Sequence, residues 1–445
     1  MNVDISSGIS VSAGELHDLA DRHVLHSLRR NRRLIFARGL GCRLWDVEGR
    51  EYLDAISGTN GPAMVGHCHP HITECLSRQL AELSSTFLSH LSVANVEFAR
   101  RLAAIAPAGL TQSYLCPGGG EAVEAAIKLA MRITGRREAI ALQGSYHGMS
   151  LGMMSLGGIP ALREWFPGGV RWPTFSQVPA ANPYRPAFTG EDAWSASILA
   201  LEAALEGTTS DSVAAIALEL VQGPAGHIAL PREYVASVQR ICRERGILLI
   251  VDEVQTALGR CGSMWATDLY GVEPDIITVG KAFGGGFPFG GVLVRPDLID
   301  EAIERDPWNI LTFQNQPLQA AAGLAVLDIV AEERLDERAQ QLGAIARERF
   351  EAMAERYEVI GDVRGPGLFI GVDLVLDRES KAPATEACTR AYDHGLDQGL
   401  ITWFGGAGNV LKFKPALTSS DIDIDEMLAR CESIIAFVER EVHGR

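Results

Sequence analysis

The sequence contains no run of lysine and arginine residues that would overcome its excess of acidic charge. Its 445 residues include 56 aspartates and glutamates against 40 lysines and arginines, which gives a formal net charge of −16 at pH 7. A surface with this excess of negative charge repels the phosphate backbone of nucleic acids. The composition therefore argues against a protein that binds DNA or RNA.

Paired cysteines and long apolar runs are also absent. The eight cysteines are scattered and form no C-x-x-C pair, which is typical of reduced thiols in the cytosol. No segment reaches the roughly 18 uninterrupted apolar residues of a membrane span, and the N-terminus has no basic start followed by an apolar stretch. We therefore expect a cytoplasmic protein without a membrane partner.

Nucleotide-binding fingerprints are missing as well. No G-x-G-x-x-G occurs, and Lys281 lacks the G-x-x-x-x-G-K-[ST] frame of a P-loop. This argues against a nucleotide-binding dehydrogenase and against a non-catalytic regulatory protein on an α/β sheet. No internal repeat is present either, so domain edges must be inferred from changes of pattern.

Those changes predict three parts. Residues 1–60 form an N-terminal arm with one helix near Ala13–Ser27 and short strands, residues 61–323 form a large domain, and residues 324–445 form a smaller α/β domain together with the arm. In the large part, the apolar runs VAAIALEL, ILLIVDEV and DIITVG alternate with helical patterns. Strands that are apolar throughout and joined by helices predict a mostly parallel α/β sheet.

Two charged residues follow buried strands of this sheet. Asp252 ends ILLIVD, and Lys281 comes directly after DIITVG. Open α/β sheets bind ligands at the carboxyl ends of their strands. A lysine in that place leaves a desolvated ammonium unless it has a function, and functional lysines form Schiff bases. The pair therefore indicates catalysis more strongly than either residue alone.

A glycine turn, Gly118 to Gly120, precedes the helical pattern EAVEAAIKLAMRIT. Free N–H groups and the helix dipole at such a turn suit a phosphate, although a plain strand-to-helix turn gives the same pattern. Tyr146 supplies an aromatic face. A phosphate cradle, a lysine, a carboxylate and an aromatic ring are together what pyridoxal phosphate requires.

These residues belong to an ordered set of motifs that resembles the class III (ornithine/GABA type) pyridoxal-phosphate aminotransferases from about Leu34 to the C-terminus. The resemblance is closest to the branch with dialkylglycine decarboxylase and amino-acid racemases and epimerases. The matching motifs are GHCHP at Gly66, GGGEAVEAAIKLA at Gly118, SYHG at Ser145, IALELVQG around Glu219, VDEVQTALGRCG at Val251, ITVGKAFGGGFP at Ile277, VRGPGLFIGVDL at Val363 and LKFKPALT at Leu411.

The resemblance implies fold-type I, pyridoxal 5'-phosphate as cofactor and a homodimer, or a dimer of dimers, with active sites at the interface. Lys281 would be the Schiff-base lysine and Asp252 the partner of the pyridine nitrogen. The other implied cofactor contacts are Gly119 and Gly120 to the phosphate, Tyr146 stacked on the ring, Val254 behind it, Gln255 to the ring oxygen, and Thr312 to the phosphate of the other subunit.

The sequence departs from the family at the substrate end. The family arginine that binds a substrate carboxylate falls at Lys412, which offers a point charge in place of a bidentate fork. Lys412 either holds that carboxylate or pairs with Glu219 as a gate for substrates without one. The substrate-facing position of the arm falls near Asn60.

Two further departures are local. The phosphate turn lacks the usual hydroxyl residue, and Asn315 and Gln316 replace the glycine and asparagine that usually follow Thr312; Ala416 replaces a proline. The packed histidines His67, His69 and His71 suggest a metal, but no second ligand cluster accompanies them, so we expect none.

Taken together, the sequence predicts an aminotransferase that moves an amino group from an amine or amino acid to a 2-oxo acid or other carbonyl. The alternative is a racemase, epimerase or decarboxylase with the same cofactor.

Overall fold

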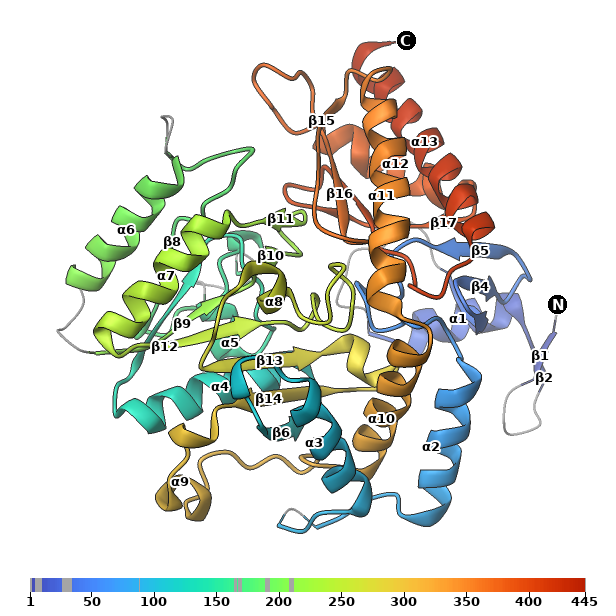
Figure 1. The fold of residues 1–445 in the computed structure, drawn as a ribbon. Helices are drawn as coiled ribbons and strands as arrows, with labels where there is room; N and C mark the ends of the chain where they lie inside the picture. The colour runs from blue at the N-terminus through green and yellow to red at the C-terminus, as the bar shows by residue number, and fades with distance from the viewer. Residues whose placement is uncertain are drawn as a thin grey trace.

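The computed structural model describes most of the chain. Figure 1 shows sheets surrounded by helices, with the C-terminal part at one end of the molecule. The residues that it describes are 2–4, 10–25, 34–87, 89–163, 166, 170–188, 193–207 and 212–444.

A seven-stranded sheet forms the middle of the molecule, in the order β6, β14, β13, β12, β9, β7, β8. Every neighbouring pair is parallel except that β14 runs antiparallel to both β13 and β6. The expected mostly parallel α/β sheet is therefore confirmed. The strands are β6 (Gln112–Cys116), β7 (Glu138–Leu142), β8 (Phe175–Val178), β9 (Val213–Leu218), β12 (Leu248–Asp252), β13 (Ile276–Gly280) and β14 (Gly290–Val294).

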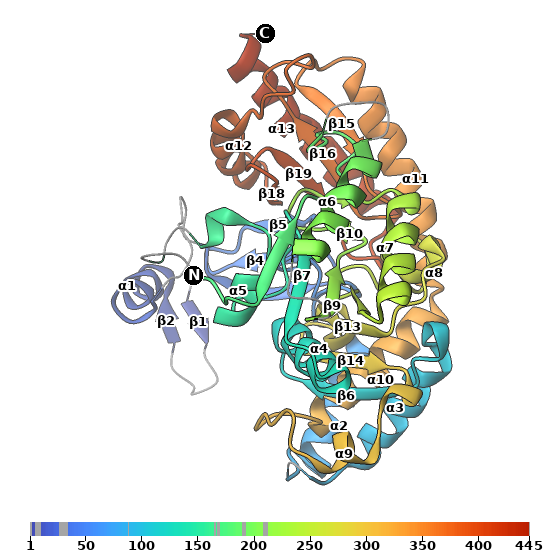
Figure 2. The same ribbon diagram turned by 90° about the vertical axis from the view of Figure 1, so that its left-hand side faces the viewer.

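Both faces of this sheet are covered by helices (Figure 2). Successive side chains of a strand point to opposite faces. In β9, Ala215 and Ala217 pack in one apolar cluster with α4 (Gly119–Thr134), whereas Ile216 and Leu218 pack in the other cluster with α7 (Arg232–Arg245). Burial on both faces explains why these strands read as unbroken apolar runs.

Glycines end the two helices where the chain turns back into the sheet. Gly135 follows α4 with φ 69°, and Gly246 follows α7 with φ 60°. These left-handed caps suit glycine, because it has no Cβ to clash there. Pro231 is the N-cap of α7. After each of these left-handed caps the chain enters the next strand in the same direction, so the carboxyl ends of the parallel strands lie at one edge of the sheet.

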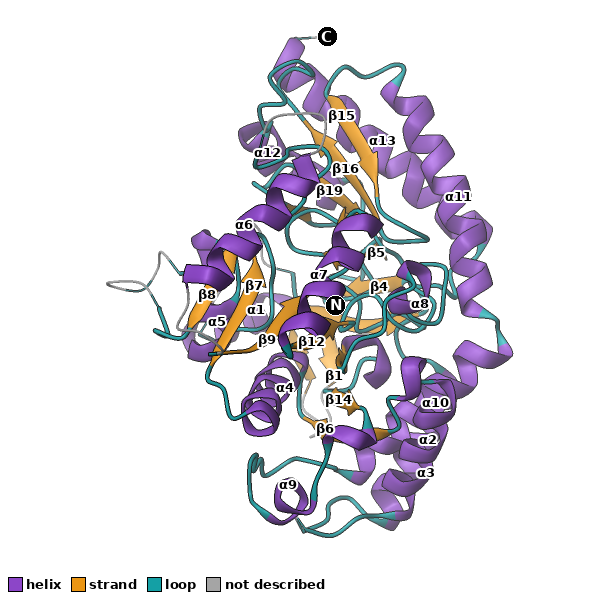
Figure 3. Cartoon of the chain, turned by 60° about the vertical axis from the view of Figure 1, so that its left-hand side comes forward, coloured by secondary structure: helices purple, strands orange, loops and turns teal. Residues whose placement is uncertain are grey.

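The C-terminal part contains an antiparallel sheet in the order β15, β16, β19, β18, enclosed by long helices (Figure 3). The long helix that begins at Leu335 ends at Ala354, and Ser420 caps the last helix. The elements are β15 (Ile360–Arg364), β16 (Ile370–Leu374), β18 (Phe404–Gly405), β19 (Val410–Phe413), α11 (Leu335–Ala354), α12 (Thr385–Asp397) and α13 (Asp421–His443).

A third sheet, in the order β17, β5, β4, β3, joins the two ends of the chain. Leu400 of β17 is in register with Leu53 of β5 in a parallel pair. The strands are β3 (Phe36–Leu40), β4 (Arg43–Asp46), β5 (Glu51–Asp54) and β17 (Leu400–Ile401). The boundaries of the three predicted parts stay a prediction.

The remaining helices include α2 (Pro70–Glu82), α3 (Val93–Ile105) and α10 (Pro317–Glu332), which pack together beside β6 and the turn that follows β13. Helix α1 ends at His23, and the last residues of the helix predicted near Ala13–Ser27 lie outside the described ranges. The short elements are β1 (Asn2–Asp4), β2 (Ser10–Ser12), β10 (Val221–Gln222), β11 (Ile228–Ala229), α5 (Leu151–Leu156), α6 (Ala193–Gly207), α8 (Ala266–Tyr270), α9 (Glu301–Arg305) and the 3₁₀ turns Pro107–Gly109, Pro160–Leu162, Lys281–Gly284 and Pro296–Leu298.

Within the described residues, no helix is both long enough and apolar enough to cross a membrane. All eight cysteines are free thiols.

Candidate active site

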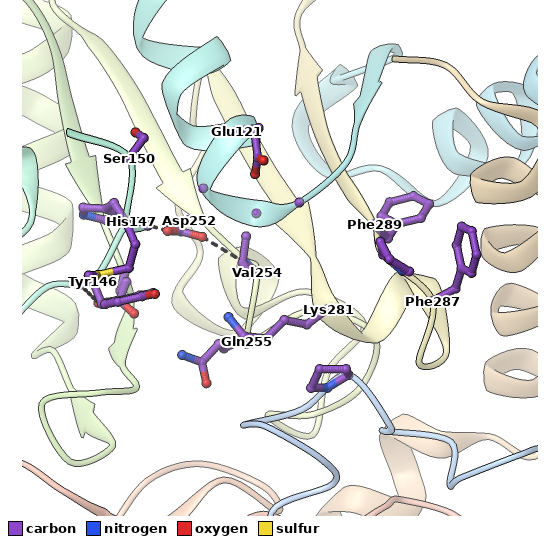
Figure 4. A pocket seen from close by; sticks show the side chains of 18 of the residues that line it. Glu121, Tyr146, His147, Ser150, Asp252, Val254, Gln255, Lys281, Phe287 and Phe289 are labelled. Atoms are coloured by element: carbon purple, nitrogen blue, oxygen red, sulfur yellow. Dashed lines mark hydrogen bonds and ion pairs between the residues drawn. The ribbon is translucent and has the colours of Figure 1, made fainter. Parts of the chain in front are cut away.

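A cavity of about 710 Å³ opens at the carboxyl ends of β12 and β13 and at the N-terminus of α4 (Figure 4). The sequence-predicted residues that line it are Gly119, Gly120, Tyr146, Glu219, Asp252, Val254, Gln255 and Lys281. The carboxyl edge of the sheet thus brings together side chains that are far apart in the sequence.

The glycine turn at the start of α4 is required by close packing. A Cβ on Gly119 would lie 2.8 Å from Cγ1 of Val254, and a Cβ on Gly120 would lie 3.2 Å from Cα of Gly148. The first N–H groups of a helix have no partner within the helix. Gly118 to Gly120 therefore form a narrow cradle of backbone N–H groups facing the cavity, and side chains would fill it.

Asp252 is fixed at the end of β12 by three hydrogen bonds. Its Oδ1 accepts from the backbone N–H of Val254 and from Oγ1 of Thr278, both at 3.1 Å, and its Oδ2 lies 2.9 Å from Nδ1 of His147. The carboxylate is buried. Its geometry is thus held by the neighbouring strand and by the loop that carries His147.

His147 is fully enclosed beside this carboxylate. Burial opposes a charge on the imidazole, but the hydrogen bond and the attraction of Asp252 outweigh it, so the pKa of His147 is raised. Nδ1 has its partner, whereas no group of the described chain lies within hydrogen-bonding distance of the buried Nε2. One polar atom of the site is therefore left unsatisfied.

Lys281 is the first residue after β13 and begins a 3₁₀ turn. Its φ is 43°, a left-handed conformation that is strained for a residue with a Cβ. Burial lowers the pKa of Lys281, although Asp252 and Glu219 favour its charged form. Within the described ranges its ammonium has no hydrogen bond and no ion pair. The amine is therefore free to react in the cavity.

Tyr146 and Glu219 form the wall opposite Lys281. The backbone N–H of Tyr146 donates to Oε2 of Glu219 at 2.9 Å. Burial raises the pKa of Glu219 to about 7, with a smaller opposing effect of His147. Burial also raises the pKa of the Tyr146 hydroxyl.

Within the described residues, no hydrogen bond or ion pair joins Lys412 and Glu219, whose pairing is one of the two alternatives that the sequence leaves open. Nζ of Lys412 donates to Oδ1 of Asn60 at 3.3 Å, and Glu219 acts on Lys412 only through its charge. Burial lowers the pKa of Lys412 to about 8. Lys412 and Asn60 therefore meet just behind the cavity, outside the residues that line it.

Thr312 is exposed and does not line the cavity of this chain. The residues that depart from the family after it tie the loop down. Oδ1 of Asn315 accepts from the N–H of Leu115 at 3.0 Å, and Oε1 of Gln316 accepts from Oγ of Ser85 at 2.7 Å. The predicted contact of Thr312 with another subunit stays a prediction.

The clustered histidines near Gly66 contact different carboxylates. His67 lies 2.8 Å from Asp54, and His71 lies 3.0 Å from Asp328. His69 lies 3.8 Å from Glu333. Because the three rings turn to separate partners, they do not converge on one point.

Several residues of the site escape the sequence patterns. Cavity-lining residues that were not predicted are Pro62, Glu121, Met149, Ser150, Phe287, Pro288 and Phe289. Phe287 to Phe289 belong to the glycine-rich stretch after Lys281, and their position next to the lysine could have indicated that they line the cavity.

The sequence patterns also miss Lys414. It directly follows β19, two residues after Lys412, and in an extended chain this spacing places both side chains on one face.

Comparison with known proteins agrees with this architecture. Residues 27–435 match the profile of the family described as aminotransferase class-III. The chain is 36% identical to the leucine/methionine racemase of Thermococcus litoralis, over 91% of each protein. It is 37% identical to the diaminobutyrate–2-oxoglutarate aminotransferase of Rhizobium meliloti, over 87% of this chain and 84% of that one.

A solved structure shows the same fold. The amine transaminase of an uncultivated Pseudomonas species, in its PLP-bound form, superposes with a TM-score of 0.85 and 28% identity, over 93% of this chain and 98% of that one.

Proposed function

The chain belongs to the class-III aminotransferase family, and from this premise we propose how its own residues transfer an amino group. The donor is an amine or amino acid, and the acceptor is a 2-oxo acid or another carbonyl compound. The cavity at the carboxyl edge of the sheet binds pyridoxal 5'-phosphate and both substrates in turn.

The residues of the cavity suit this cofactor. The cradle of Gly119 and Gly120 provides N–H groups at the positive end of a helix dipole, as a phosphate requires. Asp252 is a buried carboxylate, suited to a protonated pyridine nitrogen, and Lys281 is an unpaired amine. Pyridoxal phosphate, when bound, accepts the electron pair left by a broken bond at the substrate carbon.

Each residue would then have its own role. Lys281 would hold the cofactor covalently through its amine, and the same amine, once free, would hold or move a proton in the cavity. Its lowered pKa favours the neutral amine that both roles need. Asp252, oriented by Thr278 and His147, would face the ring nitrogen and favour its protonated form.

The other contacts position the ring. Tyr146 would cover one face of the ring and Val254 the other, Gln255 would donate to the ring oxygen, and Thr312 would reach the phosphate in the partner subunit. The observation that carries the proposal is Lys281 itself, a strained, unpaired lysine in the same cavity as a buried aspartate.

The test is a transfer assay. Purified protein loaded with pyridoxal phosphate is incubated with primary amines or amino acids, with and without a 2-oxo acid. We expect a carbonyl product from the donor that appears only when the acceptor is present. Failure of every donor and acceptor pair would contradict the proposal.

Racemisation is the second candidate, because a relative of 36% identity is a leucine/methionine racemase. The same protein is therefore incubated with single enantiomers of leucine and methionine without a 2-oxo acid, and chirality is followed. Inversion without any carbonyl product would favour the racemase over the aminotransferase.

We also propose a cytoplasmic homodimer. The eight free cysteines support a reducing compartment. Large apolar side chains exposed near Thr312 and at the α2 to α3 connection support a subunit interface; these are Leu80, Phe87, Leu91, Val93, Ile310 and Phe313.

A further inference from the structure

Lys414 is a fully buried lysine without a carboxylate partner. Its exposure is 0%, and within the described part of the chain no acidic side chain lies at ion-pair distance from its Nζ. Burying an ammonium costs free energy unless hydrogen bonds compensate it. The transfer reaction alone does not explain why a lysine is buried at this position.

Its three contacts are all with electron-rich groups. Nζ donates to Oε1 of Gln255 at 2.6 Å and to the backbone carbonyl of Asn60 at 2.8 Å, and it lies 4.5 Å from the ring centroid of Phe369. An ammonium group has three donors and no acceptor. Two of its hydrogens are thus used in hydrogen bonds, and one of these bonds reaches a cavity-lining side chain.

That side chain is an amide, which has an oxygen end and a nitrogen end. Lys414 donates to the oxygen end, so this contact leaves the NH₂ group of Gln255 for other partners. The opposite wall is close, because a Cβ on Gly223 would lie 2.5 Å from Nε2 of Gln255. The amide is thus confined between Gly223 and Lys414.

We propose that Lys414 is a positioning residue that fixes the orientation of the Gln255 amide, with its NH₂ group available to the cofactor ring oxygen. The inference rests on the proposed function. Asn60 anchors the ammonium from the N-terminal arm, so Lys414 also ties the arm to the loop after β12.

The test replaces the ammonium by an uncharged side chain of similar length, Lys414→Met. Donation by Gln255 stabilises the ionised ring oxygen, so its loss raises the midpoint of the pH titration of the cofactor's visible absorption, by about one pH unit. We also expect kcat/KM to fall about ten-fold, as loss of one charge-assisted hydrogen bond implies. Burial, together with the charges of Arg260, Lys281 and Lys412, lowers the pKa of Lys414 well below its usual value, whereas Cys261 acts in the opposite direction. The hydrogen bond to Oε1 of Gln255 is donated by the protonated and by the neutral amine alike.

Lys381 offers a matched control. Its Nζ donates to the carbonyl of Tyr184 at 3.0 Å and lies 4.7 Å from the centroid of that ring, so it has the same kinds of partner away from the cavity. Lys381→Met should leave both midpoint and kcat/KM unchanged.

A double-mutant cycle separates positioning from a change of local charge. In a Gln255→Ala background, Lys414→Met should no longer move the midpoint, because the amide that it orients is gone. An equal shift in both backgrounds would overturn the inference. If Lys414→Met does not fold, Lys414→Gln replaces it in the test. An amide at position 414 forms a hydrogen bond with either the oxygen or the NH₂ group of Gln255, so it does not fix the orientation and should also raise the midpoint.

The wild-type protein separates the two claims. Absence of cofactor absorption and transfer in the wild type would contradict the proposed function. A wild type that is active, with a Lys414→Met variant of unchanged midpoint, would overturn only the role of Lys414.

Discussion

Buried ionisable side chains surround the cavity, and the charge of each decides what it does. Asp252 accepts three hydrogen bonds, whereas burial raises the pKa of Glu219 to about 7. On the cationic side, burial lowers the pKa values of Lys281 and Lys412. The site therefore holds one carboxyl group fixed by hydrogen bonds close to two amines whose pKa values burial lowers.

Replacing Asp252 by asparagine tests the role of its carboxyl group. Asp252→Asn keeps the size of the side chain, but a neutral amide does not hold a ring nitrogen protonated. We expect kcat to fall on the order of 100-fold, as when one electrostatic stabiliser is removed. Steady-state kinetics of the cofactor-loaded variant measures this, and thermal unfolding checks that the fold is intact. Near-normal kinetics would contradict the assignment.

Lys412 is tested with an amino acid and its matching amine. If Lys412 binds the substrate carboxylate, Lys412→Met lowers kcat/KM for the amino acid about ten-fold or more and leaves the amine nearly unchanged. Lys412→Arg should keep kcat/KM for the amino acid high, because a guanidinium binds a carboxylate with two hydrogen bonds. Equal losses for both substrates would contradict carboxylate binding and favour an amine-specific gate.

The same role predicts a pH dependence. The pKa of Lys412 is lowered to about 8, so its charge is present below that pH and lost above it. The ratio of kcat/KM for the amino acid to that for the amine should therefore fall as pH rises through about 8. In Lys412→Met this ratio should not change with pH.

At the scale of helices and strands, much of the fold could be predicted because burial leaves a local trace. The strand after Ile247 is buried on both faces, and α7 carries its Pro231 and Gly246 signals in the sequence. The pairing of β17 with β5 leaves no such trace, since a strand of two residues has no period.

The site divides in the same way. Lys281 and Asp252 follow strands and were found from local pattern. The contact of Lys414 with Gln255 spans 159 residues, and the choice of Asn60 over Glu219 by Lys412 depends on side-chain reach. Such long-range polar contacts are set by tertiary packing, which a single sequence does not display.

The start of α4 gives a prediction of its own. Gly119→Ala places a methyl group 2.8 Å from Val254 in the cradle. Alanine is compatible with a helix, so the substitution should weaken cofactor binding and leave the helix intact. We expect Kd for pyridoxal phosphate to rise about ten-fold, equivalent to ~1.4 kcal/mol. Gly152→Ala is the control, because its Cβ would have no neighbour closer than 3.7 Å. Fluorescence titration measures both, and equal affinities would argue against the cradle.

At the scale of the whole molecule, the N-terminal arm and the C-terminal part meet in one sheet, and several exposed apolar side chains lie near Thr312 and at the α2 to α3 connection. β5 pairs with β17, so the N-terminal arm and the C-terminal part are joined by backbone hydrogen bonds. Phe313, next to Thr312, is 61% exposed. If the partner's cofactor lies near Thr312, this loop is part of the interface.

Phe313→Asp places a charge in that proposed interface. We expect a shift from dimer to monomer together with loss of transfer activity, because an unpaired buried charge is costly. Ile422→Asp is the control on helix α13, where the isoleucine is 77% exposed and lies in the first turn. Light scattering after size exclusion measures the mass. A dimeric, active Phe313→Asp would contradict an interface at this loop.

The central claim is that Lys281 carries the cofactor, and one measurement addresses it directly. The loaded protein is reduced with borohydride, digested, and analysed by mass spectrometry to locate the lysine that bears the pyridoxyl phosphate group. The predicted result is modification of Lys281 in the wild type and loss of that label in Lys281→Ala. A label on Lys412, Lys414 or another lysine, with Lys281 unmodified, would contradict the account.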